Sequence, residues 1–400
     1  MSTDTLLVEL GTEELPPKTL KPLSLAFRDG IVAGLKQREL RYGKVQCFAT
    51  PRRLAVLIFD VQLKAPEKII EVLGPPLDRA RDEAGNWSNA TNGFAKKQGV
   101  EPEQLQTIDT PKGPRLGLQK TVPGVAARDV LNAMIQSSIA DLPIARRMRW
   151  GARREEFVRP VHWVVAMLGQ DCDHGTIFNL STGNTTRGHR FHSSGLITLN
   201  HAKDYESALA KAKVVASFEQ RQQIIREQVD AQAQALGANA VIAPDLLDEV
   251  TGLVEWPVAL TGSFEERYLQ VPPEALISSM KEHQKYFHVV DNEGELLPHF
   301  ITVANIESAD PQQVIAGNER VIRPRLSDAA FFFETDKKIP LGERVPSLGN
   351  IVFQQKLGTL LDKTLRITQL AALLAPDVGA SVALAQRAAQ LSKADLVTDM

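Results

Sequence analysis

The chain has 400 residues, of which 43% are hydrophobic and 24% are charged, and its formal net charge is −2 at pH 7. This length and apolar content allow two or three globular domains and exclude a disordered chain. The near-neutral balance excludes nucleic-acid binding through overall charge, so any such binding must come from local basic patches.

The cysteines and the first residues bear on location. Cys47 and Cys172 are far apart in sequence, which fits a reducing compartment better than a disulfide-stabilised secreted fold. The first residues are acidic where a signal peptide is basic, and no apolar run reaches about 18 residues. We therefore expect a soluble, cytoplasmic protein.

The first predicted elements are a strand over residues 6–10 and an amphipathic helix. Apolar residues at helical spacing indicate the helix: Leu20, Leu23, Phe27, Ile31 and Leu35. The loop between them carries Glu13 and Glu14, which could chelate a metal or act in acid-base chemistry. The helix macrodipole also explains acids placed just before a helix, without invoking chemistry.

Two strands, over residues 45–48 and 54–61, flank the sequence Thr50-Pro51-Arg52-Arg53. The two arginines could hold phosphate, or they could protect a sheet edge from aggregation. Residues 64–124 are less regular and predict a helical excursion between strands. Apolar spacing then indicates a further amphipathic helix over residues 130–139.

The densest basic run follows that helix. It comprises Arg146, Arg147, Arg149, Arg153 and Arg154, with Trp150 among them and Arg159 shortly after. These arginines exceed what solubility requires, and a tryptophan can stack on a base or sugar, so the run is a candidate RNA-facing patch. Alternatively, the neighbouring glutamates neutralise the arginines and Trp150 belongs to the core. A strand over residues 157–168 comes next.

A second basic segment, residues 185–192, reads as a loop. It combines Arg187 and Arg190 with His189 and His192. Two histidines alone do not make a zinc site, and no cysteine or second histidine pair is near, so we expect no metal here. Ser217 then caps a long scaffold helix.

Residues 245–274 predict a short acidic helix, then Leu253-Val254-Glu255-Trp256-Pro257 and a strand. Glu255 is either a buried acid with a raised pKa or the ion-pair partner of an arginine. A helix carrying Lys281, His283, Gln284 and Lys285 precedes another strand, and residues 299–306 form its hairpin partner.

Asp310-Pro311 opens a helix that we expect to end in cations. Pro324 disfavours helical geometry in the preceding residue, so Arg320, Arg323 and Arg325 should splay at a helix junction, where they suit phosphate. After residue 335 the apolar spacing predicts an α-helical bundle.

Long strings in these segments resemble the β subunits of bacterial two-subunit glycyl-tRNA synthetases. The strings, in chain order, are LVELGTEELPP, TPRRLA, MRWG, FVRPVHW, RGHRF, LVEWP, EALISSMKEHQKYF, ITVANIES, GNERVIRPRLSDAAFFFETD and FQQKLGTLLDKT. Such strings in register along nearly the whole chain are far more specific than any short motif.

The resemblance implies an architecture. It comprises a multi-module α+β or α/β N-terminal region over residues 1–200, a part like the editing module of phenylalanyl-tRNA synthetase over 201–310, and the start of an all-α HD-like helical domain over 311–400. No histidine here is followed by aspartate, so we expect no phosphohydrolase activity from that domain. The resemblance also implies an N-terminal portion that lacks the anticodon-binding region.

The resemblance further implies a division of labour in an α2β2 ligase that attaches glycine to tRNA(Gly). The separate α subunit holds ATP, with Mg, and glycine, and this chain binds tRNA and no cofactor of its own. The sequence agrees, because it has no phosphate loop and no HIGH-like or KMSKS-like signature, and we assign no catalytic residue and no metal ligand.

Basic residues of the segments above are the candidates for tRNA contact. They are Arg52, Arg53, Arg146, Arg147, Arg149, Arg159, Arg187, Arg190, Lys281, Lys285, Arg320, Arg323 and Arg325. Two alternatives remain: hydrolytic editing of mischarged tRNA around Glu255 and His283, or a scaffold that docks the α dimer.

Overall fold

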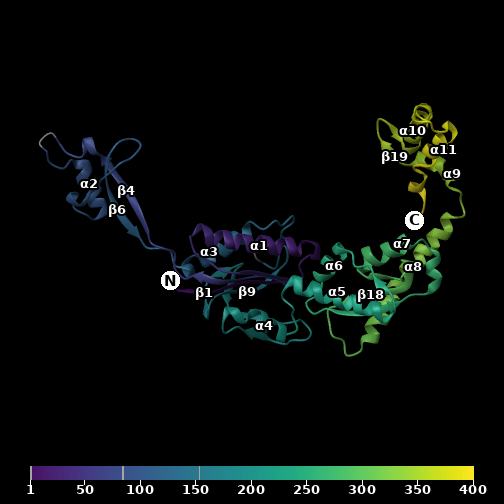
Figure 1. Ribbon diagram of the computed structural model, residues 1–400, viewed down its shortest axis with the longest axis horizontal. Helices are drawn as coiled ribbons and strands as arrows, with labels where there is room; N and C mark the ends of the chain where they lie inside the picture. The colour runs from purple at the N-terminus through teal and green to yellow at the C-terminus, as the bar shows by residue number, and fades with distance from the viewer. Residues whose placement is uncertain (1, 83–84, 153) are drawn as a thin grey trace. The chain divides into compact units, whose positions relative to one another are not determined.

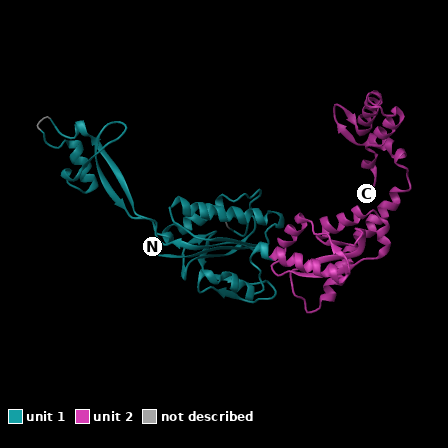
Figure 2. Cartoon of the chain, viewed as in Figure 1, with its two compact units in different colours: residues 1–220 teal, residues 221–400 magenta. Residues whose placement is uncertain are grey.

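The computed structural model describes residues 2–82, 85–152 and 154–400. The chain divides into two compact units, Met1–Gln220 and Arg221–Met400 (Figure 2). Both units mix helices with several small sheets, which confirms an α+β protein (Figure 1). Among the described residues, no helix combines the length and apolarity needed to cross a lipid bilayer.

The main sheet of unit 1 has the strand order β11-β12-β9-β1-β3-β2, with β10 also paired to β9. Its strands are β1 (Thr3–Thr12), β2 (Val45–Thr50), β3 (Arg53–Gln62), β9 (Val161–Leu168), β10 (Asp171–Cys172), β11 (Thr176–Ile177) and β12 (Leu180–Gly183). All pairings are antiparallel except that of β12 with β9. The strands predicted at residues 6–10, 45–48 and 54–61 are confirmed.

The strand predicted over residues 157–168 is interrupted. A short β8 (Glu156–Phe157) pairs with β7 (Met148–Arg149), and β9 begins only at Val161. Pro160 lies between them and has no N–H to donate to a sheet ladder, which accounts for the break.

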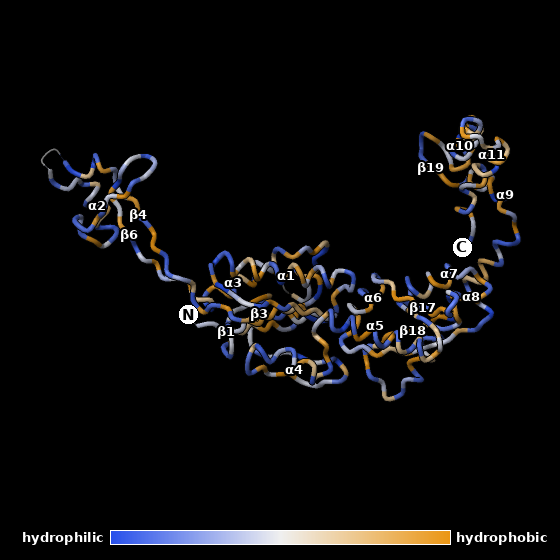
Figure 3. Tube along the Cα trace, in the orientation of Figure 1, coloured by the Kyte–Doolittle hydropathy of each residue, from blue (hydrophilic) through white to orange (hydrophobic). Residues whose placement is uncertain are grey.

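Helices cover both faces of this sheet. The helices α1 (Pro17–Gln37) and α3 (Ala127–Ala140) lie on one face and α4 (Tyr205–Lys211) on the other (Figure 1). Leu6, Val8 and Leu10 of β1 pack toward α1 and α3, whereas Leu7 packs toward α4. The strands are among the most hydrophobic stretches of the trace (Figure 3). Each fully buried leucine contributes about 1.5–3 kcal/mol, so this two-sided burial fixes the register.

Residues 64–124 do not form the helical excursion that we predicted. They hold a three-stranded antiparallel sheet of β4 (Lys68–Pro76), β6 (Arg115–Val122) and β5 (Gln106–Ile108), with one helix, α2 (Asn89–Gln98). A small core of Ala80, Ala95, Leu105 and Leu116 joins them. The prediction was wrong because β4 finds its partner β6 across a long connection, and no local periodicity reports such a pairing.

Unit 2 contains a four-stranded antiparallel sheet in the order β15-β17-β18-β16. Its strands are β15 (Asn239–Ala240), β16 (Val258–Ser263), β17 (Phe287–Val290) and β18 (Leu296–Ala304). The helices around it are α5 (Phe218–Ala235), α6 (Pro244–Thr251), α7 (Pro273–Ser278) with its π-helical continuation η5 (Ser279–Gln284), and α8 (Pro311–Asp336). Ser217 Oγ accepts a hydrogen bond from Gln220 N, which confirms the predicted cap of α5.

The helix junction predicted at Pro324 is wrong, because α8 runs through this proline to Asp336. Ile322 and Leu326 lie one turn apart on either side of Pro324, and both side chains are fully buried. They pack in a core with Tyr268 and Met280. Burial of two such side chains contributes an amount similar to the roughly 3 kcal/mol that an internal proline costs.

The segment after residue 336 is mainly helical but not all-α as expected. It contains α9 (Leu341–Arg344), α10 (Leu360–Leu374) and α11 (Val382–Leu391), and also a hairpin of β19 (Val352–Gln354) with β20 (Gly358–Thr359). Thr359 ends the hairpin and caps α10, since its Oγ1 accepts a hydrogen bond from Asp362 N. Thr359 therefore belongs both to the hairpin and to the cap of α10, and apolar spacing alone does not reveal this arrangement.

Candidate nucleic-acid interface

Three of the candidate arginines meet at one pocket of unit 1, with a volume of about 400 Å³. Arg52 lies in the turn between β2 and β3, Arg187 ends β13 (Thr185–Arg187), and Arg190 lies in the segment that follows it. The lining residues are Glu13, Arg52, Arg187, Gly188, Arg190, Ser193, Ser194 and Gly195. Three guanidinium groups against one carboxylate make the pocket cationic, and guanidinium forks match the geometry of phosphate oxygens.

The ring of one tryptophan lies near two of these arginines and near their neighbour Arg53. The guanidinium carbons of Arg52, Arg53 and Arg187 lie 5.8, 5.9 and 5.7 Å from the centre of the Trp163 ring. The ring lies over Gly11 of β1, where a Cβ atom would stand only 1.8 Å from the indole. Gly11 is therefore required here for the close approach of the ring, not for its backbone angles.

A buried ion pair lies on the same face of the sheet. Arg53 Nη1 is 3.3 Å from Glu9 Oε1, and both side chains are fully buried. Thr186 Oγ1 donates to the same carboxylate oxygen at 2.9 Å, and Arg53 Nε donates to Thr50 Oγ1 at 3.1 Å. Because Arg53 has no exposed surface, it supports the pocket from below and cannot contact a ligand.

Burial dominates the electrostatics of this pair. Desolvation raises the pKa of Glu9, and the charge of Arg53 and the hydrogen bond from Thr186 partly offset that rise. Burial, and then the nearby Glu9, raise the pKa of Tyr205 well above its ordinary value. Removing either charge would leave the other enclosed without its partner.

Glu13 lines the pocket and also contacts a residue beside it. Its carboxylate lies 2.8 Å from Arg190 Nη2 and 2.9 Å from His162 Nε2, and Arg190 Nη1 also reaches Glu14 at 3.4 Å. Burial raises the pKa of Glu13, but the hydrogen bonds from Arg190 and His162 outweigh it and leave that pKa lowered. These contacts give the two acids partners of their own, and the role of the α1 dipole stays a prediction.

One of the two histidines of the second basic segment, His189, is structural. His189 is fully buried, and its Nδ1 accepts hydrogen bonds from the main-chain N–H groups of Phe191 and His192 at 3.2 and 3.3 Å. An Nδ1 that accepts twice carries no proton. Within the described ranges, no group of three or more His, Cys, Asp or Glu side chains is placed to hold a metal ion.

The basic run before β9 is exposed and partly neutralised. Arg149 pairs with Glu156 at 2.7 Å, and Arg147 donates to the carbonyl of Ala140. Arg146 and Arg154 are exposed, and Arg153 lies outside the described residues. Trp150 packs against the core beside Phe178, with the ring centres 5.9 Å apart, so it follows the core interpretation.

Arg159 belongs to the rim of the pocket rather than to that run. Its Nε donates to the main-chain oxygen of Glu14 at 3.1 Å, and its Nη1 donates to that of Val158. The structure therefore places Arg159 beside the same acidic loop that Arg190 contacts.

In unit 2 the two candidate lysines have acidic partners. Lys281 pairs with Asp245 at 2.8 Å, and Lys285 pairs with Glu249 at 3.1 Å. Asp245 and Glu249 are one turn apart on the same face of α6, and each of them pairs with one lysine. The cationic helix predicted before β17 is thus locally compensated.

The arginines of α8 are spread along a continuous helix. Arg323 pairs with Glu265 at 2.8 Å, and Arg320 and Arg325 are exposed. Because the helix does not break at Pro324, these side chains follow helical spacing and do not converge as a fork.

Glu255 lies inside unit 2 with 1% of its surface exposed. Its main-chain N–H and that of Trp256 donate to Asn305 Oδ1 at 2.6 and 3.2 Å. His283 of η5 is exposed, whereas Glu255 is enclosed. The carboxyl group of Glu255 is therefore enclosed and is not presented to a substrate.

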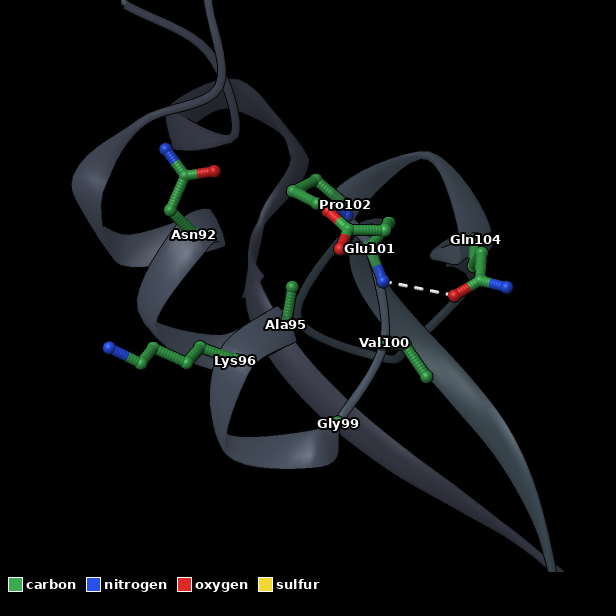
Figure 4. A pocket seen from close by; sticks show the side chains of 8 residues that line it. All are labelled: Asn92, Ala95, Lys96, Gly99, Val100, Glu101, Pro102 and Gln104. Carbon is green, nitrogen blue, oxygen red and sulfur yellow. Dashed lines mark hydrogen bonds between the residues drawn. The ribbon is translucent and has the colours of Figure 1, made fainter.

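A second hollow, of about 470 Å³, lies beside α2 (Figure 4). Its lining includes Lys96 and Glu101, and Lys96 extends away from Glu101 and Gln104. Glu101 N donates to Gln104 Oε1 at 2.9 Å, which closes the turn. One cation and one acid give this hollow no net charge, so it lacks the anion preference of the arginine pocket.

The sequence did not single out several residues of this site. Trp163 and Phe191 lie within FVRPVHW and RGHRF, but no periodicity marks either residue as part of a site. Gly11 is the available signal, since a glycine within a strand, here near the end of β1, can mark the close approach of another group.

The fold and the pocket together define a class, an α+β protein with a cationic pocket suited to phosphate. A family model described as "Glycyl-tRNA synthetase beta subunit" matches residues 6–400, and the chain belongs to this family.

Named relatives agree with this assignment. Proteins named "Glycine--tRNA ligase beta subunit" from Marinobacter nauticus and Chromohalobacter salexigens are each 52% identical, over 402 and 400 residues, and one from Hahella chejuensis is 50% identical over 401 residues. Each alignment covers all of this chain and 58% of the relative. The chain thus spans less than two thirds of the length of these relatives.

Proposed function

We propose that this chain is the tRNA-binding N-terminal part of the β subunit of an ATP-dependent glycine–tRNA ligase. The observation that carries the proposal is the convergence of Arg52, Arg187 and Arg190 on one pocket, the first two of them over the ring of Trp163. Membership of the β-subunit family supplies the identity of the nucleic acid. Phosphate neutralisation supplies most of the affinity in such complexes.

The candidate residues contribute unequally in this proposal. The principal contacts are arginines of the pocket, of its surroundings and of the basic run: Arg52, Arg146, Arg147, Arg159 and Arg187. Arg53 is left out because it is fully buried. A second group contributes less, because an ion pair must break before each of its members meets a phosphate: Arg149, Arg190, Lys281, Lys285 and Arg323.

The proposal includes a division of labour. The chain works in the cytoplasm within an α2β2 assembly, in which the α subunit holds glycine, ATP and Mg, and this chain contributes tRNA(Gly) binding and no catalytic residue. Its other proposed role is to dock the α dimer. The segment after residue 336, with α10 and α11, is proposed as the start of an HD-like helical domain.

The test is the equilibrium affinity of the 400-residue chain for tRNA(Gly) and for an unrelated tRNA, titrated across salt concentration. We expect the chain to bind tRNA(Gly) selectively. The logarithm of the association constant should fall with the logarithm of the salt concentration, with a slope of about −0.9 for each duplex phosphate contacted. Weak and equal binding of both tRNAs would contradict tRNA recognition and leave the role of docking the α dimer.

Hydrolytic editing receives no support from the geometry of unit 2. Its proposed acid, Glu255, is enclosed, and the exposed His283 lies in the π-helical turn η5. Hydrolysis needs an acid or base within hydrogen-bond reach of a substrate.

A further inference from the structure

We propose that the arginine pocket and the exposed ring of Phe191 form a subsite for one unpaired RNA nucleotide. The phosphate occupies the pocket, and the base stacks on Phe191. This inference rests on the proposed function and adds that the site takes a single strand rather than a duplex.

The charge of the pocket selects the phosphate. Arg52, Arg187 and Arg190 line it together with one acid, Glu13, which Arg190 and His162 already contact. The hydroxyl groups of Ser193 and Ser194 also line the pocket. Guanidinium and hydroxyl donors around a space of about 400 Å³ suit a phosphate and its sugar.

The loop that carries these groups is held in one shape. Residues 188–195 connect β13 to β14 (Leu196–Thr198), and these strands pair with each other. His189 anchors the loop from inside through its two accepted hydrogen bonds, and Ser193 N donates to the carbonyl of His189 at 3.0 Å. The loop is therefore already ordered in the folded chain, so binding does not carry the entropy cost of ordering it.

Phe191 points out of this well-anchored loop. Its side chain is 75% exposed, whereas its neighbour His189 is fully buried. Phe191 directly follows Arg190, a lining residue of the pocket. An aromatic ring on a rigid loop beside phosphate-binding arginines is the combination that single-stranded RNA sites use, because every base can stack on such a ring.

Pairing state decides which RNA can use the subsite. In an A-form duplex the bases stack on one another and their faces are closed to side chains. Only an unpaired nucleotide can offer a phosphate and an open base face together. The chemistry therefore favours a single-stranded end or loop of the tRNA over its helical stems.

The experiment measures the affinity of the 400-residue chain for a labelled single-stranded RNA tetranucleotide, a blunt RNA duplex and tRNA(Gly). The variants are Phe191→Leu, Phe191→Tyr and Arg187→Ala, with Arg226→Ala, an exposed arginine of α5, as the matched control. Folding of each variant is checked by its thermal unfolding curve.

We expect Phe191→Leu and Arg187→Ala each to weaken tetranucleotide binding about tenfold. Phe191→Tyr and Arg226→Ala should bind as the unaltered chain does, because the first keeps a stacking ring and the second lies outside the subsite. Duplex binding should be insensitive to Phe191→Leu.

Equal tetranucleotide affinity of Phe191→Leu and the unaltered chain would overturn the subsite while leaving tRNA binding intact. An equal loss of duplex binding in Phe191→Leu would overturn the single-strand preference. Failure of the unaltered chain to bind tRNA(Gly) would instead overturn the proposed function, and the tetranucleotide series would still decide the subsite.

Discussion

The cations of unit 1 and unit 2 look alike in sequence and differ in what surrounds them. Around the pocket of unit 1, Arg52 and Arg187 face the ring of one tryptophan from separate segments. In unit 2, Lys281 and Lys285 each meet an acid of α6. The difference teaches that the partner of a cation, rather than the number of cations, decides which surface is open to phosphate.

The pocket of unit 1 is also supported by buried side chains of the sheet. Glu9 and Arg53 pair inside the sheet, and Trp163 lies in the gap over Gly11. A buried pair gives little net stability, but it is costly to break. Variants of the buried support should therefore have larger effects than variants of the exposed ion pairs.

The largest effect is expected from Arg53→Met. This change leaves Glu9 enclosed without its cation, so we expect the free energy of unfolding to fall by about 3–5 kcal/mol. Urea unfolding followed by circular dichroism measures it. The double variant Glu9→Leu/Arg53→Met removes both charges and should recover much of the loss. A single variant as stable as the unaltered chain would show that the pair does not support the pocket.

Gly11→Ala should have the next largest effect. The new methyl group would stand 1.8 Å from the Trp163 ring, so the ring must move and the free energy of unfolding should fall by about 1–3 kcal/mol. Gly93→Ala on α2 is the control, since no heavy atom lies within 4 Å of the added carbon. If the two variants were equally stable, the position of the Trp163 ring would not depend on the absence of a side chain at Gly11.

Charge reversal compares the two units directly. We expect Arg187→Glu to lower the affinity for tRNA(Gly) about tenfold and to reduce the salt slope by about 1. Lys281→Glu should change both by much less, because Lys281 is already paired with Asp245. Fluorescence anisotropy at several salt concentrations measures both. An equal loss in the two variants would erase the distinction between the units.

The smallest effect is expected from Glu13→Gln. The pKa of Glu13 is lowered below its ordinary value of 4.5, so its ion pairs stabilise the fold above that pH. The contribution is lost as the pH falls through the lower folded-state pKa. We expect the unaltered chain to exceed Glu13→Gln by less than about 1 kcal/mol at neutral pH, since the pair is partly exposed. Thermal unfolding from pH 7 to pH 3 should show this difference disappearing; a difference that grows in acid would contradict the assignment.

The sequence by itself determined the elements that depend on neighbours along the chain. Alternating and helical spacing located β1, α1, α3 and α5, because a buried face repeats every two residues in a strand and every 3.6 in a helix. Ser217 marked the start of α5 through a cap that spans three residues. The strings from LVELGTEELPP to FQQKLGTLLDKT were enough to indicate the family.

Only the tertiary structure decided which candidate residues act together. Arg52 and Arg190 are distant in sequence and line one pocket, whereas Arg53, next to Arg52, is buried against Glu9. Arg52 lies in the turn before β3 and Arg53 begins that strand, and the groups that surround each of them come from distant parts of the chain. The same reason explains Pro324, where the burial of Ile322 and Leu326 overrode a local preference for a break.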